Sequence, residues 1–224
     1  MPRTSYHASI TSTAGPEGPP YRDHYPAALP DGTWLNLPLQ PLPGGEQAIA
    51  LLMSNQTPFE VEQRLGALLS RAAADFSPEV IAGVPTMGLD YARIVARELG
   101  LPHYVALGNS RKFWYTDTLS VAVRSVTSPG APKRLYLDPM LLERLAGRRT
   151  LVIDDVVSTG ASAAAAIELL HGAGAVVIGL CVVLTEGNAW REALQSLAPD
   201  WPSRVRSLGR IPIFRSTAAG WVPE

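Results

Sequence analysis

Two adjacent carboxylates followed by a short run of hydroxyl-bearing and glycine residues form the part of the sequence best suited to chemistry. Residues 151–153 are apolar, as in a buried parallel strand, and Asp154 and Asp155 follow directly. Residues 158–162 then read Ser-Thr-Gly-Ala-Ser and are expected to open a helix. Free N–H groups and the positive end of a helix dipole favour a phosphate at such a point. The pattern predicts an anion site beside two acids at the carboxyl end of a strand, where open α/β sheets bind ligands. An ordinary strand-to-helix corner with capping residues is the structural alternative.

This run resembles the signature of the type I phosphoribosyltransferases, in which apolar residues, two acids and two further apolar residues precede a Ser/Thr-Thr-Gly-x-Ser/Thr loop. The resemblance implies that Asp154 and Asp155 face the ribose hydroxyls of phosphoribosyl diphosphate (PRPP). It implies that the 5-phosphate lies in a loop made of Val157, Ser158, Thr159, Gly160, Ala161 and Ser162. It implies no direct metal ligand in the protein, because Mg²⁺ is carried in with PRPP.

A second candidate anion site is the loop of Thr86, Met87 and Gly88, which lies between an expected strand and an expected helix. A plain connector that needs Gly88 for a positive φ is the alternative. The resemblance implies that this loop binds diphosphate. Family members usually carry Arg-Gly or Lys-Gly there, whereas this chain has Met87-Gly88. Diphosphate would then be held by backbone N–H groups and by charge from elsewhere.

Arg111 and Lys112 are the expected source of that charge, because they follow a strand and a guanidinium can bind phosphate oxygens through two bonds. A solvated surface pair is the alternative. The resemblance implies contact with diphosphate or closure of the site. Residues 125–138 resemble the flexible catalytic loop of the same family, which excludes water when it closes. Asp138 stands where adenine-type members carry a Glu that handles the base proton, or else it forms an Asp-Pro turn of a β-hairpin.

Alternating strand and helix patterns predict an α/β fold, a doubly wound parallel sheet of the type I phosphoribosyltransferase kind. Thr57 is expected to cap a helix that runs to about Ala73, with an apolar face of Phe59, Leu65, Leu68 and Leu69. Residues 1–45 are rich in Pro, Gly and aromatics and are expected to form a small irregular hood, with residues 21–42 covering the base. Residues 46–224 should form the α/β core and a C-terminal extension.

Composition narrows the class of protein. The 224 residues are 46% hydrophobic and 17% charged, with a net charge of −1, so the chain can bury a core and shows no basic excess for nucleic acid. Cys181 lies in an apolar run and is expected to be a core thiol. No run suits a signal peptide or a membrane span, and a cytoplasmic protein is expected.

The resemblance implies a purine phosphoribosyltransferase of adenine-like type, which joins a nucleobase to PRPP with Mg²⁺, releases diphosphate and forms a homodimer. A PRPP-sensing regulator with little catalysis is the main alternative, because Met87 replaces a basic residue. A scaffold role would not need an acidic pair beside an anion site. The acceptor stays open among adenine, guanine, hypoxanthine, xanthine, orotate and a non-standard amine.

Overall fold

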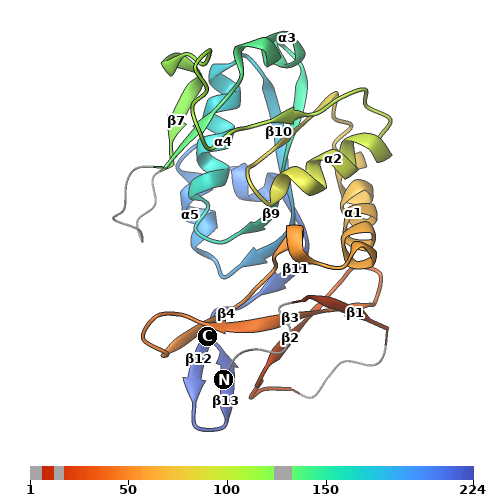
Figure 1. Cartoon of the computed structure of the whole chain (residues 1–224), viewed down its shortest axis with the longest axis vertical. Coiled ribbons are helices and arrows are strands. Elements are labelled where there is room, and N and C mark those ends of the chain that lie inside the picture. The colour runs from red at the N-terminus through yellow and green to blue at the C-terminus, as the bar shows by residue number, and fades with distance from the viewer. Residues whose placement is uncertain (1–6, 13–17, 124–132) are drawn as a thin grey trace.

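The computed structural model describes residues 7–12, 18–123 and 133–224, and these form an α/β body joined to an antiparallel sheet (Figure 1). Residues 125–132 of the expected catalytic loop lie outside the described residues. Within the described part of the chain, no helix is both long and apolar enough to cross a membrane.

Five parallel strands form the centre of the α/β body. In spatial order they are β11 (Val205–Ile211), β10 (Val176–Glu186), β9 (Arg149–Val157), β5 (Val80–Gly83) and β6 (Val105–Ala106). The long apolar stretches of β9 and β10 are almost wholly buried, as expected of central strands covered on both faces.

Helices cover both faces of this sheet. Alternate side chains of β9 point to opposite faces, so Ile153 packs into one core cluster and Val152 into the other. The first cluster contains buried residues of α1 (Phe59–Ala74) and α2 (Gly88–Glu98). The second contains residues of α4 (Ala161–Gly172) and α5 (Ala189–Gln195). The predicted doubly wound parallel sheet is therefore confirmed.

Shorter elements connect these helices and strands. A two-stranded antiparallel ribbon is formed by β7 (Ser120–Ala122) and β8 (Arg134–Tyr136). The remaining pieces are the helix α3 (Leu142–Leu145) and the 3₁₀ turns η1 (Ser54–Gln56), η2 (Asp117–Leu119), η3 (Pro139–Leu141) and η4 (Trp201–Arg204).

The described residues of the expected hood contribute strands to a regular antiparallel sheet rather than an irregular segment, and this whole sheet is called the hood below. Its strands are β1 (Ser9–Thr11), β2 (His24–Ala28), β3 (Trp34–Pro41), β4 (Gln47–Ala50), β12 (Phe214–Thr217) and β13 (Gly220–Pro223). Leu35, Leu37 and Leu39 alternate along β3 and are all buried, which is the period-two pattern of a strand with one face in the core. Residues from both ends of the chain thus share one sheet (Figure 1).

The start of α1 differs from the sequence prediction. The helix begins after Pro58, and the hydroxyl of Thr57 donates to the carbonyl oxygen of Ser54 instead of capping α1. Phe59, expected on the apolar face, is 78% exposed, whereas Leu65, Leu68 and Leu69 are buried. Phe59 occupies the first helical position, outside the stripe that faces the sheet.

One core cluster joins the hood to the α/β body. It contains hood residues such as Leu37 and Phe214 together with Ile81 and Leu151 of the parallel sheet. Cys181 lies in the same cluster, and burial raises the pKa of its thiol to about 12, so it is the core thiol that the sequence predicts.

Candidate active site

A cavity of about 280 Å³ opens at the carboxyl ends of β5 and β9. Its lining comes from two segments: residues 84–87, which lead into α2, and residues 154–163, which run from the end of β9 into the first turn of α4. The structure therefore brings together the acidic pair, the Ser/Thr/Gly loop and the Thr86–Met87 loop, as the positions of these residues at one edge of a parallel sheet predict.

Asp154 and Asp155 are the last acidic residues of β9, which continues through them to Val157. Asp154 is buried, and its Oδ1 accepts a hydrogen bond from the N–H of Asp155 at 2.9 Å. Burial, with the neighbouring charge of Asp155, raises the pKa of Asp154 well above its ordinary value, and burial also raises the pKa of Asp155. Two desolvated carboxyls side by side favour a ligand that brings hydroxyl donors or positive charge.

Gly88 is needed because α2 begins directly against the acidic pair. A Cβ added to Gly88 would lie 2.8 Å from both Cα and Oδ1 of Asp154, closer than any side chain allows. The residue does not have a positive φ, so close approach rather than turn geometry explains this glycine. The positive end of the α2 dipole consequently faces the cavity beside Asp154.

The loop before α2 turns its carbonyl groups towards the protein. The hydroxyl of the buried Ser54 donates to the carbonyl oxygen of Met87 at 3.0 Å, and the N–H of Leu89 donates to that of Thr86 at 3.3 Å. The peptide between Pro85 and Thr86 is cis. Within the described residues, the backbone N–H groups of Thr86 and Met87 have no protein acceptor. The loop can thus offer N–H donors to an anion although it carries no basic side chain.

The loop before α4 forms a cup at the N-terminus of a twelve-residue helix. Gly160 has φ +80°, and a Cβ there would lie 2.8 Å from the Cβ of Ala193 and 3.0 Å from the Cα of Trp190. The hydroxyl oxygen of Thr159 accepts a long hydrogen bond, 3.4 Å, from the N–H of Ala161. Among the described residues, the N–H groups of Thr159 and Gly160 have no acceptor, so they can point at a bound phosphate together with the helix dipole.

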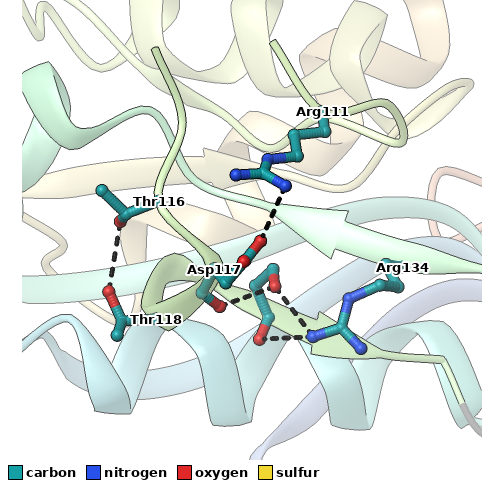
Figure 2. A network of polar contacts seen from close by, with 6 residues as sticks. Arg111, Thr116, Asp117, Thr118 and Arg134 are labelled. Atoms are coloured by element: carbon teal, nitrogen blue, oxygen red, sulfur yellow. Dashed lines mark hydrogen bonds and ion pairs between the residues drawn. The ribbon is translucent and has the colours of Figure 1, made fainter. Parts of the chain in front are cut away.

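Arg111 and Lys112 do not line this cavity. Both are exposed in the loop after β6, and Arg111 Nη1 lies 3.2 Å from Asp117 Oδ1 (Figure 2). Figure 2 also shows Arg134 of β8 bonded to the backbone and hydroxyl oxygens of Ser120, which joins β8 to β7. The proposed contact of the Arg-Lys pair with diphosphate stays a prediction.

Asp138 also lies away from the cavity lining. Its Oδ1 accepts from the N–H of Met140 at 3.0 Å, and its Oδ2 accepts from Nε1 of Trp114 at 3.1 Å. Asp138 thus caps the turn η3, which is the Asp-Pro turn of the alternative interpretation. Its role towards the base proton stays a prediction.

Two residues beside the site have no part in the sequence prediction. Glu186, the last residue of β10, is buried, and burial raises the pKa of its carboxyl, an effect that the nearby Ser158 of the cup partly offsets. Tyr91 of α2 is fully buried, and its hydroxyl has no hydrogen-bond partner among the described residues. Burial raises the pKa of Tyr91, and the charge of Asp155 adds to the shift. A Glu that follows the apolar run 176–184 after one intervening Thr is the sequence signal that could have indicated Glu186.

The acidic pair fits a divalent ion that brings most of its own ligands. Within the described residues, no group of three or more His, Cys, Asp or Glu side chains could hold a metal ion. Mg²⁺ is usually held by one or two carboxylates together with substrate phosphates. Asp154 and Asp155 can supply such carboxylates at the cavity wall.

A family model described as a phosphoribosyl transferase domain matches residues 60–205. The chain is 33% identical over 127 residues to a hypoxanthine/guanine phosphoribosyltransferase of Methanosphaerula palustris, which covers 57% of this chain and 59% of that protein. It is 28% identical over 109 residues to an orotate phosphoribosyltransferase of Staphylococcus saprophyticus, which covers 49% of this chain and 43% of that protein. The chain thus spans about half the length of these curated relatives.

Two solved structures share the fold. The adenine phosphoribosyltransferase of Giardia lamblia, complexed with 9-deazaadenine, superposes with a TM-score of 0.54 at 20% identity, over 72% of this chain and 93% of that one. The orotate phosphoribosyltransferase of Aeropyrum pernix gives a TM-score of 0.52 at 22% identity, over 77% of this chain and 85% of that one.

Proposed function

Because the chain belongs to the type I phosphoribosyltransferase family, we propose that it joins a nucleobase to PRPP and releases diphosphate. The observation that carries this proposal is the single cavity that holds both anion loops and the acidic pair. Two phosphate groups separated by a ribose need two anion sites on either side of hydroxyl acceptors, and the two loops and the acidic pair that line this cavity support that arrangement.

The chemistry we propose is mainly electrostatic. The 5-phosphate lies against the N-terminus of α4, which fixes the ribose over Asp154 and Asp155. These carboxyls accept hydrogen bonds from the ribose hydroxyls and offset positive charge that develops at the anomeric carbon. The free N–H groups of Thr86 and Met87 bind the departing diphosphate. Mg²⁺ carried in with PRPP would supply further positive charge to the leaving group.

Arg111 and Lys112 are proposed to add positive charge when the loop after β6 moves towards the cavity. Arg111 must first leave Asp117, and an exposed ion pair of this kind contributes at most about 1 kcal/mol. A bound diphosphate can therefore draw Arg111 away at little cost.

We further propose a purine as the acceptor, a homodimeric assembly and a cytoplasmic location. The purine is supported by the hypoxanthine/guanine and adenine enzymes among the matches, whereas the orotate enzymes among them favour a pyrimidine. A PRPP-sensing protein with little catalysis is the second candidate, and Met87 in place of a basic residue is the observation that favours it.

Calorimetric titration with PRPP and Mg²⁺, followed by a panel of nucleobases, tests the proposal. PRPP binding followed by diphosphate release with one base supports a transferase, and binding without turnover of any base supports the sensor. Thr159→Val should abolish PRPP binding, and Asp155→Asn should lower turnover by about 10²-fold or more. Thr118→Val and Asp75→Asn, at exposed positions outside the cavity, serve as matched controls. Unchanged PRPP affinity in Thr159→Val together with unchanged turnover in Asp155→Asn would show that the cavity is not the PRPP site.

A further inference from the structure

Glu186 is a buried carboxylate at the carboxyl edge of the sheet that the proposed mechanism does not use. It is 9% exposed, and burial raises the pKa of its carboxyl, an effect that the nearby hydroxyl of Ser158 partly offsets. Among the described residues, no ion pair joins it to a cation. Glutamate is rarely buried unless it is paired, because loss of hydration disfavours its charge. Glu186 does not line the cavity itself, but Thr185 before it pairs with Val157 of the cavity lining. A buried carboxylate at this place needs a further hydrogen-bond donor.

The order of the strands indicates which part of the substrate lies over Glu186. The diphosphate loop follows β5, the acidic pair belongs to β9, and Glu186 ends β10, which pairs with β9 on the side away from β5. Neighbouring strands lie about 5 Å apart, so a ribose over β9 reaches both neighbours. If diphosphate leaves towards β5, a group that attacks from the opposite face must approach from the side of β10.

The hood bounds that side of the site. β11, the neighbour of β10, ends at Ile211, and the hood strand β12 begins at Phe214. A Cβ added to Gly209 of β11 would lie 3.0 Å from the carbonyl oxygen of Ala28 in β2, so the hood packs closely on this strand. An acceptor that attacks from the side of β10 would then lie between the end of β10 and the hood.

We infer that Glu186 selects the acceptor by taking hydrogen bonds from a base edge that presents N–H donors, such as an exocyclic amine. This inference rests on the proposed function and narrows its acceptor. An ionised carboxylate only accepts hydrogen bonds, so a base with a carbonyl at the same edge leaves both groups unpaired. A base that carries a carboxylate is repelled outright.

The wild-type protein and Glu186→Gln test the inference together. Adenine, hypoxanthine and orotate are offered with PRPP and Mg²⁺, and kcat/KM is measured for each base while PRPP affinity is measured separately by calorimetry. Wild type should prefer adenine over hypoxanthine by about tenfold or more and should not use orotate. Glu186→Gln should lower the adenine-to-hypoxanthine ratio by about tenfold or more and leave PRPP affinity within about threefold.

Ser158→Ala separates base recognition from a purely structural role. If Glu186 only shapes the cup, Ser158→Ala and Glu186→Gln should weaken PRPP binding alike and leave the ratio of the two bases unchanged, which would overturn the inference. Equal wild-type rates on adenine and hypoxanthine would overturn it too, without any variant. PRPP binding and turnover in either case would leave the transferase proposal standing, whereas absence of PRPP binding in wild type would overturn both.

Discussion

The buried carboxyl of Asp154 lowers the stability of the folded protein in a pH-dependent way. Burial raises the pKa of Asp154 in the folded protein above the unfolded value of about 3.9. The contribution of the protonated carboxyl to the free energy of unfolding is therefore full below that pH and is lost as pH rises through the folded pKa. Asp154→Asn should therefore raise Tm at pH 7, and the gain should vanish near pH 4. Thermal unfolding across this range measures it, with Asp75→Asn as the exposed control. A Tm at pH 7 below that of wild type would contradict the prediction.

Tyr91 carries a buried hydroxyl without a partner among the described residues, which costs stability in the substrate-free protein. Because an unsatisfied buried polar group costs about 1–3 kcal/mol, Tyr91→Phe should leave the free energy of unfolding unchanged or raise it by about 1 kcal/mol. Urea unfolding measures this. A clear loss of stability would show that the hydroxyl has a partner after all, since the ring itself is retained.

The acidic pair and the cup are predictable from the sequence because strand, acids and loop follow one another directly along the chain. Glu186 and Tyr91 are not, because they come from β10 and α2 and approach the site only after the sheet and its helices have packed. A turn role was one expectation for Gly88, whereas the approach of α2 to Asp154 requires the glycine. Contacts between distant segments leave no local pattern to find.

The junction between α2 and β9 is the element-scale feature on which the site depends. Gly88→Ala would place a Cβ 2.8 Å from the backbone of Asp154, so α2 or β9 must shift. Such overpacking costs about 1–3 kcal/mol, and PRPP affinity should fall by about 10- to 100-fold. Calorimetric titration with PRPP measures the effect.

Gly172→Ala near the C-terminal end of α4 is the matched control for Gly88→Ala, because a Cβ there meets nothing within 4 Å. It should bind PRPP as wild type does. Equal losses in the two variants would show that any Gly→Ala change perturbs binding and that the α2–β9 contact has no special role.

Elements with strong local periodicity were predicted well, and those that depend on remote partners were not. The strands and helices from β5 to β10 follow their hydrophobic patterns closely. The hood was expected to be irregular because its short strands are interrupted by Pro and Gly, yet β12 from the far end of the chain pairs with β4. Phe59 was placed on the apolar face by type alone, although it precedes the stripe that meets the sheet.

The whole molecule should unfold as one unit, because a single core cluster includes both the hood and the α/β body. Phe214 is fully buried in it and makes ring contacts with Tyr21 and Tyr25. Phe214→Ala should lower the free energy of unfolding by about 3–5 kcal/mol while keeping one transition. Calorimetric scans with and without PRPP measure this, and PRPP should raise the midpoint of that one transition in wild type. A separate early transition in Phe214→Ala would mean that the hood folds independently of the α/β body. The acceptor would then bind next to a mobile sheet rather than a rigid one.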